Sequence, residues 1–348
     1  MKPEGRPEDL VAAWTVVCLL VLAAPFVLRW ARRRRGRVAL VAGNATVLVA
    51  LVALLGVGLE TWLRPGYAGT TWHAANNVTQ AWFERHWRVN DEGFRDEQWP
   101  DAPGPREDRV GFLGDSFTAG YGVIDPEDRF PDLVRARLRQ QTGRPLDVRN
   151  LGSIGAGTQR TLDLVRDALP AWNPRRLILQ YALNDVEYLL PPETRDGASL
   201  PAAEPGSLVR RSYLLDLVRA QWLLARTGHG ATYHAQLDAI HKDDTLWREH
   251  ETNLRTMASL CRRNSTRLEV VVFPLLAEWG DAYPYAAWHA RVRETFERMG
   301  VPVLDLSEAF AGTPGSELVV SVFDAHPNEL AHRLAADAVW EAYFASGH

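Results

Sequence analysis

The sequence predicts an α/β protein in which helices cover both faces of a parallel five-stranded sheet, preceded by a hairpin of two transmembrane helices. Two long uncharged segments near the N-terminus predict the hairpin. Beyond residue 108, short apolar runs alternate with segments of helical periodicity, and Gly, Pro and Asn stand between them. This alternation is typical of parallel sheets whose crossover helices lie on both faces.

The hairpin is predicted from residues 10–28 and 38–59, which contain no charged side chain. Each segment reaches the ~20 residues that a helix needs to cross a bilayer. Both are apolar on all faces, whereas a surface helix of a soluble protein keeps a polar face. A cleaved signal peptide fits the first segment poorly, because Glu4, Glu8 and Asp9 precede it and arginines follow it where small residues should stand. We therefore expect both helices to span the membrane and to contact its lipid.

The orientation of the hairpin follows from the residues between its helices. Residues 29–37 contain six arginines. Short loops rich in Arg and Lys remain on the cytoplasmic side of a membrane. The N-terminal tail, residues 1–9, is therefore expected on the extracytoplasmic side. The same holds for a juxtamembrane segment, 60–104, and for a folded domain, 105–348.

Composition excludes several classes of protein. The formal net charge of -4 gives no indication of a nucleic-acid partner. Two cysteines, Cys18 and Cys261, are too few for a disulfide framework. No cluster of His, Cys and Asp has the spacing of a metal site, so we expect neither a metal nor a cofactor. His229, His234 and His241 are expected at the surface.

The folded domain begins with the first strong strand, and its elements are predicted in chain order. The predicted strands cover 109–113, 146–151, 176–181, 268–273 and 302–306. The predicted helices cover 130–141, 158–169, 244–263 and 329–344, the last with Asn328 as its N-cap. In the third of these helices, apolar residues and one histidine recur at helical spacing and are expected in the core: Leu246, Trp247, His250, Leu254, Met257 and Cys261.

A long insertion, residues 186–243, separates the third and fourth strands. It contains a loop rich in Pro, Gly and Ser over 191–207 and a helical pattern over 212–226. We interpret it as a surface insertion with a packed helix, and a lid over the site is the alternative.

Residues with catalytic chemistry follow the ends of successive strands. "GDSF" follows the first strand, "NLGSIGAGT" the second and "LND" the third, and "DAHPN" precedes the last helix. Each motif alone is typical of a turn or a helix cap. Parallel strands bring their carboxyl ends to one edge of the sheet, where ligands bind. Together the motifs supply a serine, a base with its acid, and donors for an oxyanion, which is what acyl transfer requires.

This ordered set of motifs resembles the SGNH/GDSL hydrolases, a family of serine esterases, lipases and acyltransferases. The resemblance covers about 105–348 and implies a flavodoxin-like three-layer sandwich. It implies Ser116 as the nucleophile, with Asp324 and His326 as acid and base. It also implies an oxyanion hole made by Ser116, Gly155 and Asn184. Upstream, "RVNDEGFRDEQ" looks like a segment that precedes this domain in membrane-anchored bacterial members, which implies the bacterial cytoplasmic membrane as the location.

The sequence departs from the family pattern at two places. Ala182 stands where the third motif usually has glycine. The acid usually precedes the histidine by three residues, whereas Asp324 precedes His326 by two. The proline after His326 favours an extended backbone, in which residues i and i+2 face the same side. Asp324 can therefore reach the imidazole, and Asp305 and Asp185 are the alternative acids.

Three functions agree with these features. The first is a membrane-tethered serine ester hydrolase that acts on an acyl or acetyl ester of a cell-envelope glycan or lipid. The second is an O-acyltransferase of an envelope polysaccharide, which would need a membrane partner to deliver the acyl group. The third is a non-catalytic scaffold, against which the intact set of site residues argues. We expect the first.

Overall fold

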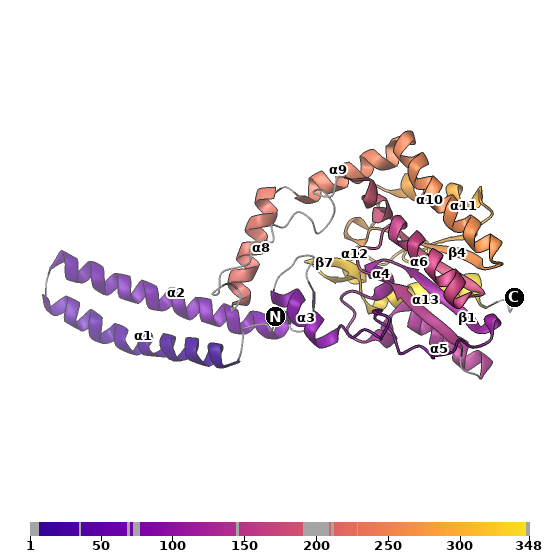
Figure 1. Ribbon diagram of the computed structural model, residues 1–348. Helices are drawn as coiled ribbons and strands as arrows, with labels where there is room; N and C mark the ends of the chain where they lie inside the picture. Colours follow the sequence, from indigo (N-terminus) through magenta and orange to yellow (C-terminus); the bar gives the residue numbers. More distant parts are fainter. Residues whose placement is uncertain are drawn as a thin grey trace. The chain divides into compact units, whose positions relative to one another are not determined.

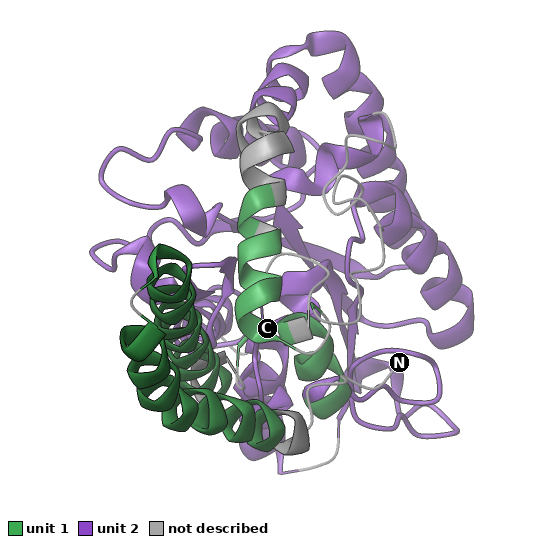
Figure 2. Cartoon of the chain, turned by 90° about the vertical axis from the view of Figure 1, so that its left-hand side faces the viewer, with its two compact units in different colours: residues 1–70, 74–85, 200–227 green, residues 71–73, 86–199, 228–348 purple. Residues whose placement is uncertain are grey.

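A computed structural model describes residues 7–34, 36–67, 70–71, 77–143, 146–190, 209, 212–227 and 229–345. The expected loop 191–207 and most of the tail 1–9 lie outside this part of the chain. The chain divides into two compact units, which Figure 2 shows in green and purple. Unit 1 contains residues 1–70, 74–85 and 200–227, and unit 2 contains residues 71–73, 86–199 and 228–348.

Unit 1 is helical (Figure 1). Its two longest helices, α1 (Pro7–Arg34) and α2 (Arg37–Tyr67), pack side by side and are long and apolar enough to span a membrane. Trp14 Nε1 of α1 donates a hydrogen bond to Thr61 Oγ1 of α2, with 2.9 Å between the two atoms. Most of their large apolar side chains are exposed, including Leu22 and Leu51. This pattern suits helices that are surrounded by lipid.

Two shorter helices complete unit 1, namely α3 (Asn77–His86) and α8 (Tyr213–Thr227). Helix α8 is held to α2 by the carboxylate of Glu60, which accepts hydrogen bonds from the backbone N–H groups of Tyr213 and Leu214. The helix expected over 212–226 is thus present. It belongs to the same unit as the two apolar helices.

Unit 2 is built on the predicted five-stranded parallel sheet. The strand order is β2-β1-β3-β4-β5, and every neighbouring pair is parallel. Every strand begins and ends within one residue of its predicted bounds: β1 (Arg109–Gly114), β2 (Asp147–Gly152), β3 (Arg176–Ala182), β4 (Arg267–Phe273) and β5 (Val303–Asp305).

Helices cover both faces of this sheet, as predicted. Consecutive residues of each strand point to opposite faces, so that Leu177 and Leu179 of β3 join one apolar cluster and Ile178 joins the other. The first cluster is covered by α6 (Thr158–Trp172), α10 (Asp244–Arg263) and α11 (Ala286–Glu297). The second is covered by α5 (Phe130–Thr142) and α13 (Glu329–Tyr343).

The expected core face of α10 is confirmed. His250 is fully buried, Leu246 is partly buried, and the other four residues of the set are buried. Asn328 caps α13 as predicted, because its side chain accepts hydrogen bonds from the N–H groups of Leu330 and Ala331. The remaining short elements are α4 (Ser116–Ala119), α9 (His229–Lys242), α12 (Gly315–Leu318), and the 3-10 turns η1 (Arg106–Asp108), η2 (Pro126–Asp128), η3 (Leu183–Leu189) and η5 (Leu276–Glu278).

A second sheet was not expected from the sequence: β6 (Val319–Ser321) pairs antiparallel with β7 (Asp324–Pro327). The order of the main sheet also places its topological switch point between β1 and β3, whose connections leave in opposite directions. Ligands of doubly wound folds bind at this point, beyond the carboxyl ends of the strands.

Candidate active site

Ser116 lies at the switch point, where β1 ends and α4 begins. The N-cap of α4 is the residue before it, because Asp115 Oδ1 accepts a hydrogen bond from Phe117 N–H at 2.8 Å. Ser116 therefore is not the helix cap, and its hydroxyl forms a hydrogen bond elsewhere. Its partner is His326, whose Nε2 lies 2.8 Å from Ser116 Oγ.

His326 and Asp324 lie on the same short strand, β7, two residues apart. His326 Nδ1 lies 2.5 Å from Asp324 Oδ1, and the same oxygen accepts the His326 backbone N–H at 3.0 Å. The extended backbone thus places both side chains on one side of the strand, as the His-Pro pair predicted. The structure brings Ser116, His326 and Asp324 into one chain of hydrogen bonds.

The charge of Asp324 is held in a buried position. Asp324 is 1% exposed, and burial alone would raise its pKa. The adjacent His326 and the hydrogen bonds from His326 and Thr71 outweigh burial and lower the pKa of Asp324 to about 2. An ionised carboxylate can only accept, so His326 Nδ1 carries a proton and donates it. In the tautomer that carries its one proton on Nδ1, the ring leaves Nε2 as an acceptor for the Ser116 hydroxyl.

Two aromatic rings enclose the imidazole of His326. Tyr121 stacks on it with 4.3 Å between ring centroids, and Phe117 meets it edge-on at 5.5 Å. Both come from the chain that directly follows Ser116. The turn that presents the serine therefore also limits the orientation of the histidine ring.

The Ser116 turn is tied to the neighbouring strands by two buried amides. Gln180 Oε1 of β3 accepts hydrogen bonds from Asp115 N–H at 3.1 Å and from Thr118 Oγ1 at 2.9 Å. Asn150 Nδ2 of β2 donates to the carbonyl of Thr118 at 2.8 Å. Burial also raises the pKa of Asp115. These contacts fix the backbone on both sides of Ser116.

Gly155 and Asn184, the expected oxyanion donors, follow the strands on either side of β1. Gly155 lies in the turn after β2 with φ 66°, a left-handed conformation that favours glycine. Asn184 lies in η3, directly after β3. The two loops touch, since a Cβ on Gly157 would lie 3.1 Å from the carbonyl oxygen of Asp185. Both candidate donors therefore belong to one pair of packed loops at the carboxyl edge of the sheet.

The two alternative acids have other surroundings. Asp305 lies 3.0 Å from His289 Nδ1 and 3.0 Å from Arg293 Nη2. Its pKa falls to about 2, because the hydrogen bond from His289 outweighs burial. Asp185 is buried, and burial raises its pKa well above the usual range, reinforced by the charge of Asp115. Asp324, by contrast, contacts the His326 ring directly.

His241 is not at the surface, so that expectation was wrong. Its ring is 2% exposed, stacks on Trp288 with 4.2 Å between centroids, and has Nε2 2.9 Å from the carbonyl oxygen of Leu183. Burial lowers the pKa of His241 to about 4, so the ring is neutral and Nε2 donates. This bond supports the residue next to Asn184. His229 and His234 lie in α9, and their side chains fall outside the description.

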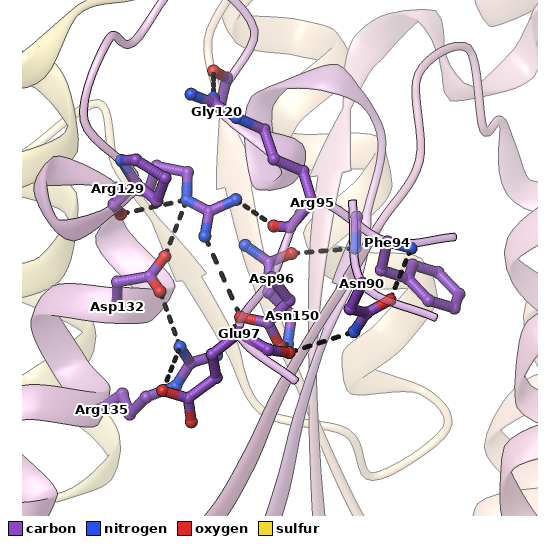
Figure 3. Close-up of polar contacts among 12 residues, drawn as sticks. Asn90, Phe94, Arg95, Asp96, Glu97, Gly120, Arg129, Asp132, Arg135 and Asn150 are labelled. Atoms are coloured by element: carbon purple, nitrogen blue, oxygen red, sulfur yellow. Dashed lines mark hydrogen bonds and ion pairs between the residues drawn. The ribbon is translucent and has the colours of Figure 1, made fainter. Parts of the chain in front are cut away.

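Residues 88–98 contact the chain that follows Ser116 through Arg95, whose side chain Figure 3 draws near Gly120. Arg95 is 2% exposed and donates to the carbonyl oxygens of Gly120 at 2.5 Å and Val123 at 2.7 Å. It also reaches the carbonyl oxygen of Ile124 at 3.2 Å. Burial and the nearby charge of Arg129 lower the pKa of Arg95 to about 9.

Asp96 of the same segment connects residues 88–98 to β2 and to α5. Figure 3 shows its carboxylate between the side chains of the neighbouring helix and the backbone of the strand. Asp96 Oδ1 pairs with Arg135 Nη2 at 2.5 Å, and Oδ2 accepts Asn150 N–H at 2.8 Å. Residues 88–98 are thus built into unit 2, although they precede the first strand of its sheet.

Tyr121, Gln180 and Arg95 were not among the expected functional residues, and His241 was expected at the surface. Tyr121 is one turn beyond the serine, but nothing in the sequence reveals that its ring meets His326. Gln180 interrupts an otherwise apolar strand, and a buried polar residue at that position is a usable signal. No three side chains of His, Cys, Asp or Glu within the described part of the chain are grouped so as to hold a metal ion.

A family model described as "GDSL-like Lipase/Acylhydrolase family" matches residues 112–334, well over half of the chain. The chain belongs to this family. As a GDSL-like acylhydrolase it is a serine ester hydrolase, and the match includes Ser116, Asp324 and His326. No curated protein matches the chain significantly.

Solved structures similar to this GDSL-like acylhydrolase include three esterases or lipolytic proteins. A GDSL-family lipolytic protein from Veillonella parvula is 13% identical (TM-score 0.42), and the match covers 68% of this chain and 98% of that one. A psychrotrophic esterase from Pseudoalteromonas sp. is 13% identical (TM-score 0.41), over 67% and 95% of the two chains. A mutant acetyl-xylooligosaccharide esterase from Geobacillus Stearmophilus is 16% identical (TM-score 0.43), over 69% and 95%.

Proposed function

We propose that this acylhydrolase is tethered to a membrane and cleaves an acyl or acetyl ester of a cell-envelope glycan or lipid through an acyl-enzyme on Ser116. The observation that carries the proposal is the hydrogen-bond chain from Ser116 Oγ to His326 Nε2 at 2.8 Å and from His326 Nδ1 to Asp324 Oδ1 at 2.5 Å. A serine hydroxyl becomes a nucleophile when an adjacent base accepts its proton. His326 is in that position.

In the first half-reaction, Ser116 Oγ attacks the ester carbonyl carbon while His326 Nε2 takes the hydroxyl proton. The carbonyl oxygen becomes an oxyanion, which the N–H groups of Ser116 and Gly155 and the side-chain amide of Asn184 stabilise. Collapse of this intermediate breaks the bond to the alcohol oxygen. The alcohol leaves with the proton from His326, and the acyl group remains on Ser116.

In the second half-reaction, His326 Nε2 takes a proton from water, and the water oxygen attacks the acyl carbon. Collapse releases the carboxylic acid and returns the proton to Ser116 Oγ. In both halves Asp324 remains ionised. Its role is to hold the imidazole in the tautomer with Nδ1–H and to stabilise the transient imidazolium.

An assay on the full chain in detergent or nanodiscs tests this function. The wild type should hydrolyse p-nitrophenyl acetate, and Ser116→Ala should be inactive while it keeps the wild-type melting temperature. Equal rates for the two proteins would contradict the proposed nucleophile. With an acetylated oligosaccharide, release of free acetate supports hydrolysis, whereas preferential transfer to a sugar acceptor would assign the chain to the acyltransferases.

The membrane part of the proposal is supported by α1 and α2, which are long and apolar enough to span a bilayer, and by the six arginines between residues 29 and 37. Arginine-rich turns remain in the cytoplasm, so unit 2 is proposed to lie outside it. Protease added to intact spheroplasts should digest unit 2 and spare a cytoplasmic control protein. Full protection of unit 2, with digestion only after lysis, would contradict this orientation.

A further inference from the structure

Asp324 has a second hydrogen-bond partner, which comes from the stretch of chain between α2 and α3. Thr71 Oγ1 donates a hydrogen bond to Asp324 Oδ2. The two residues are separated by 253 positions in the sequence. Thr71 lies only a few residues beyond the last residue of α2, Tyr67, and outside the family match, 112–334. It nevertheless belongs to the compact unit that holds the active site.

The two carboxylate oxygens of Asp324 accept hydrogen bonds from different residues. Oδ1 accepts from His326 Nδ1 at 2.5 Å and from the His326 backbone N–H at 3.0 Å. Within the described residues, the donor that reaches Oδ2 is the Thr71 hydroxyl. A buried charged oxygen without a donor carries a large desolvation cost. Removal of the hydroxyl therefore leaves one half of the carboxylate unsatisfied and free to rotate.

Thr71 is enclosed, so its hydroxyl has little freedom to leave Asp324. The residue is fully buried. Its carbonyl oxygen accepts a hydrogen bond from Ser321 Oγ of β6 at 3.5 Å. On the other side, a Cβ on Gly122 would lie 3.0 Å from Thr71 Oγ1. Thr71 thus fits between the β6–β7 sheet and the turn after Ser116.

We propose that Thr71 is a positioning residue for the catalytic acid: its hydroxyl fixes the Asp324 carboxylate so that Oδ1 faces His326. The inference rests on the proposed roles of Ser116, His326 and Asp324. It means that the membrane-proximal segment supplies part of the active site. The GDSL-like domain alone, from β1 onward, lacks this contact.

Three variants of the full chain test the role of the hydroxyl. Thr71→Val keeps the shape of the side chain and removes the donor. It should lower kcat by up to about 10²-fold, the effect of a catalytic group held slightly out of place, and leave KM unchanged. Thr71→Ser keeps the donor and should restore kcat. Thr266→Val is the matched control: Thr266 is buried and donates to the Pro174 carbonyl at 2.7 Å, at the opposite edge of the sheet.

A purely structural role for Thr71 predicts a different pattern. Thr71→Val and Thr266→Val would then lower the melting temperature by similar amounts, and neither would lower kcat. That result would overturn the inference, as would a Thr71→Ser variant as slow as Thr71→Val. An effect on kcat confined to Thr71→Val supports it.

A double-mutant cycle asks whether Thr71 acts through Asp324. Residues that act as one unit have non-additive effects. In an Asp324→Ala background, Thr71→Val should therefore slow phosphonate labelling of Ser116 no further. If Thr71→Val slowed labelling by the same factor in the Asp324→Ala background as in the wild type, Thr71 would act independently of Asp324, and the inference would be refuted. Failure of the proposed function gives a different result, namely phosphonate labelling that persists in Ser116→Ala.

Discussion

His326 Nε2 lies 2.8 Å from Ser116 Oγ, although 210 positions separate the two residues in the sequence. Ser116 is positioned by the end of a central strand, and His326 by a two-stranded sheet at the same edge. The contact therefore depends on the whole of unit 2 being folded.

Asp324, and not Asp305, should be the acid. Asp324→Asn should lower kcat by up to ~10⁴, because the imidazole loses the carboxylate that selects its tautomer. Asp305→Asn is the control, since Asp305 pairs with His289 and Arg293. It should retain near wild-type turnover of p-nitrophenyl acetate. The reverse ranking would assign the acid to Asp305 and leave Ser116 and His326 unchanged.

Asn184 should contribute to the oxyanion hole. Asn184→Ala should lower kcat by roughly 10²–10³, the usual effect of removing one oxyanion donor. The fold should persist, because Asn184 lies in a turn beyond β3 and its Oδ1 accepts no hydrogen bond within the described residues. Steady-state kinetics and circular dichroism measure the two effects. An unchanged kcat would place the donor elsewhere.

Arg95 should be required for both stability and turnover. Arg95→Met leaves the buried carbonyl oxygen of Val123 without its donor, which costs about 1–3 kcal/mol of unfolding free energy. The Gly120 carbonyl loses one of two donors and keeps the Val123 N–H at 3.2 Å. A shift of this backbone also moves Tyr121 on His326, so kcat should fall. Denaturant titration and kinetics report the two quantities.

The control for Arg95 is Arg139→Met. Arg139 forms an exposed pair with Glu97. Loss of such a pair costs about 0.2–1 kcal/mol. If both variants lost equally little stability, the proposed support of the Ser116 turn by Arg95 would be wrong.

His250 should make the free energy of unfolding depend on pH. Burial lowers the pKa of His250 to about 3, and its ring nitrogens lie 3.0 Å from Tyr181 Oη and 3.2 Å from Tyr188 Oη. The unfolded chain has a pKa of about 6.5 at this residue. Above pH 6.5 the His250 ring is neutral in both the folded and the unfolded chain, so it adds no pH dependence to the free energy of unfolding. Below that pH, protonation stabilises only the unfolded chain, and stability is lost until the pH reaches about 3.

The comparison of wild type with His250→Gln isolates this effect from other groups that titrate. The stability advantage of the wild type should shrink by about 1.4 kcal/mol per pH unit as the pH falls below 6.5. Denaturant titrations at pH 7.5, 6.0 and 5.0 measure it. A constant difference over this range would mean that His250 takes up a proton as readily in the folded protein as in the unfolded chain.

Much of this fold was predictable because its signals are local. The strands of the main sheet are short runs rich in apolar residues, such as β4 (RLEVVVF), and the resemblance to the SGNH/GDSL family indicated the candidate site residues. The i, i+2 spacing in "DAHP" correctly indicated that Asp324 and His326 share a side of one strand. The surface assignment of His241 failed, because the partners that bury it, Trp288 and Leu183, are distant in sequence.

Other features leave almost no trace in the sequence. The strands β6 and β7 have three and four residues, too few for a periodic pattern. Thr71 and Asp324 are 253 positions apart, and no sequence pattern indicates that they are in contact. Arg95 belongs to a charged segment that is typical of an exposed surface, yet it is buried among backbone carbonyl groups.

The central claim is that Ser116 is the nucleophile and that His326 activates it. Covalent labelling of the full chain in nanodiscs by a fluorophosphonate, followed by peptide mass mapping, tests it most directly. We expect one phosphonylated residue, Ser116, with labelling abolished in Ser116→Ala and His326→Ala. Labelling of a different residue, or labelling of Ser116 that persists undiminished in His326→Ala, would contradict it.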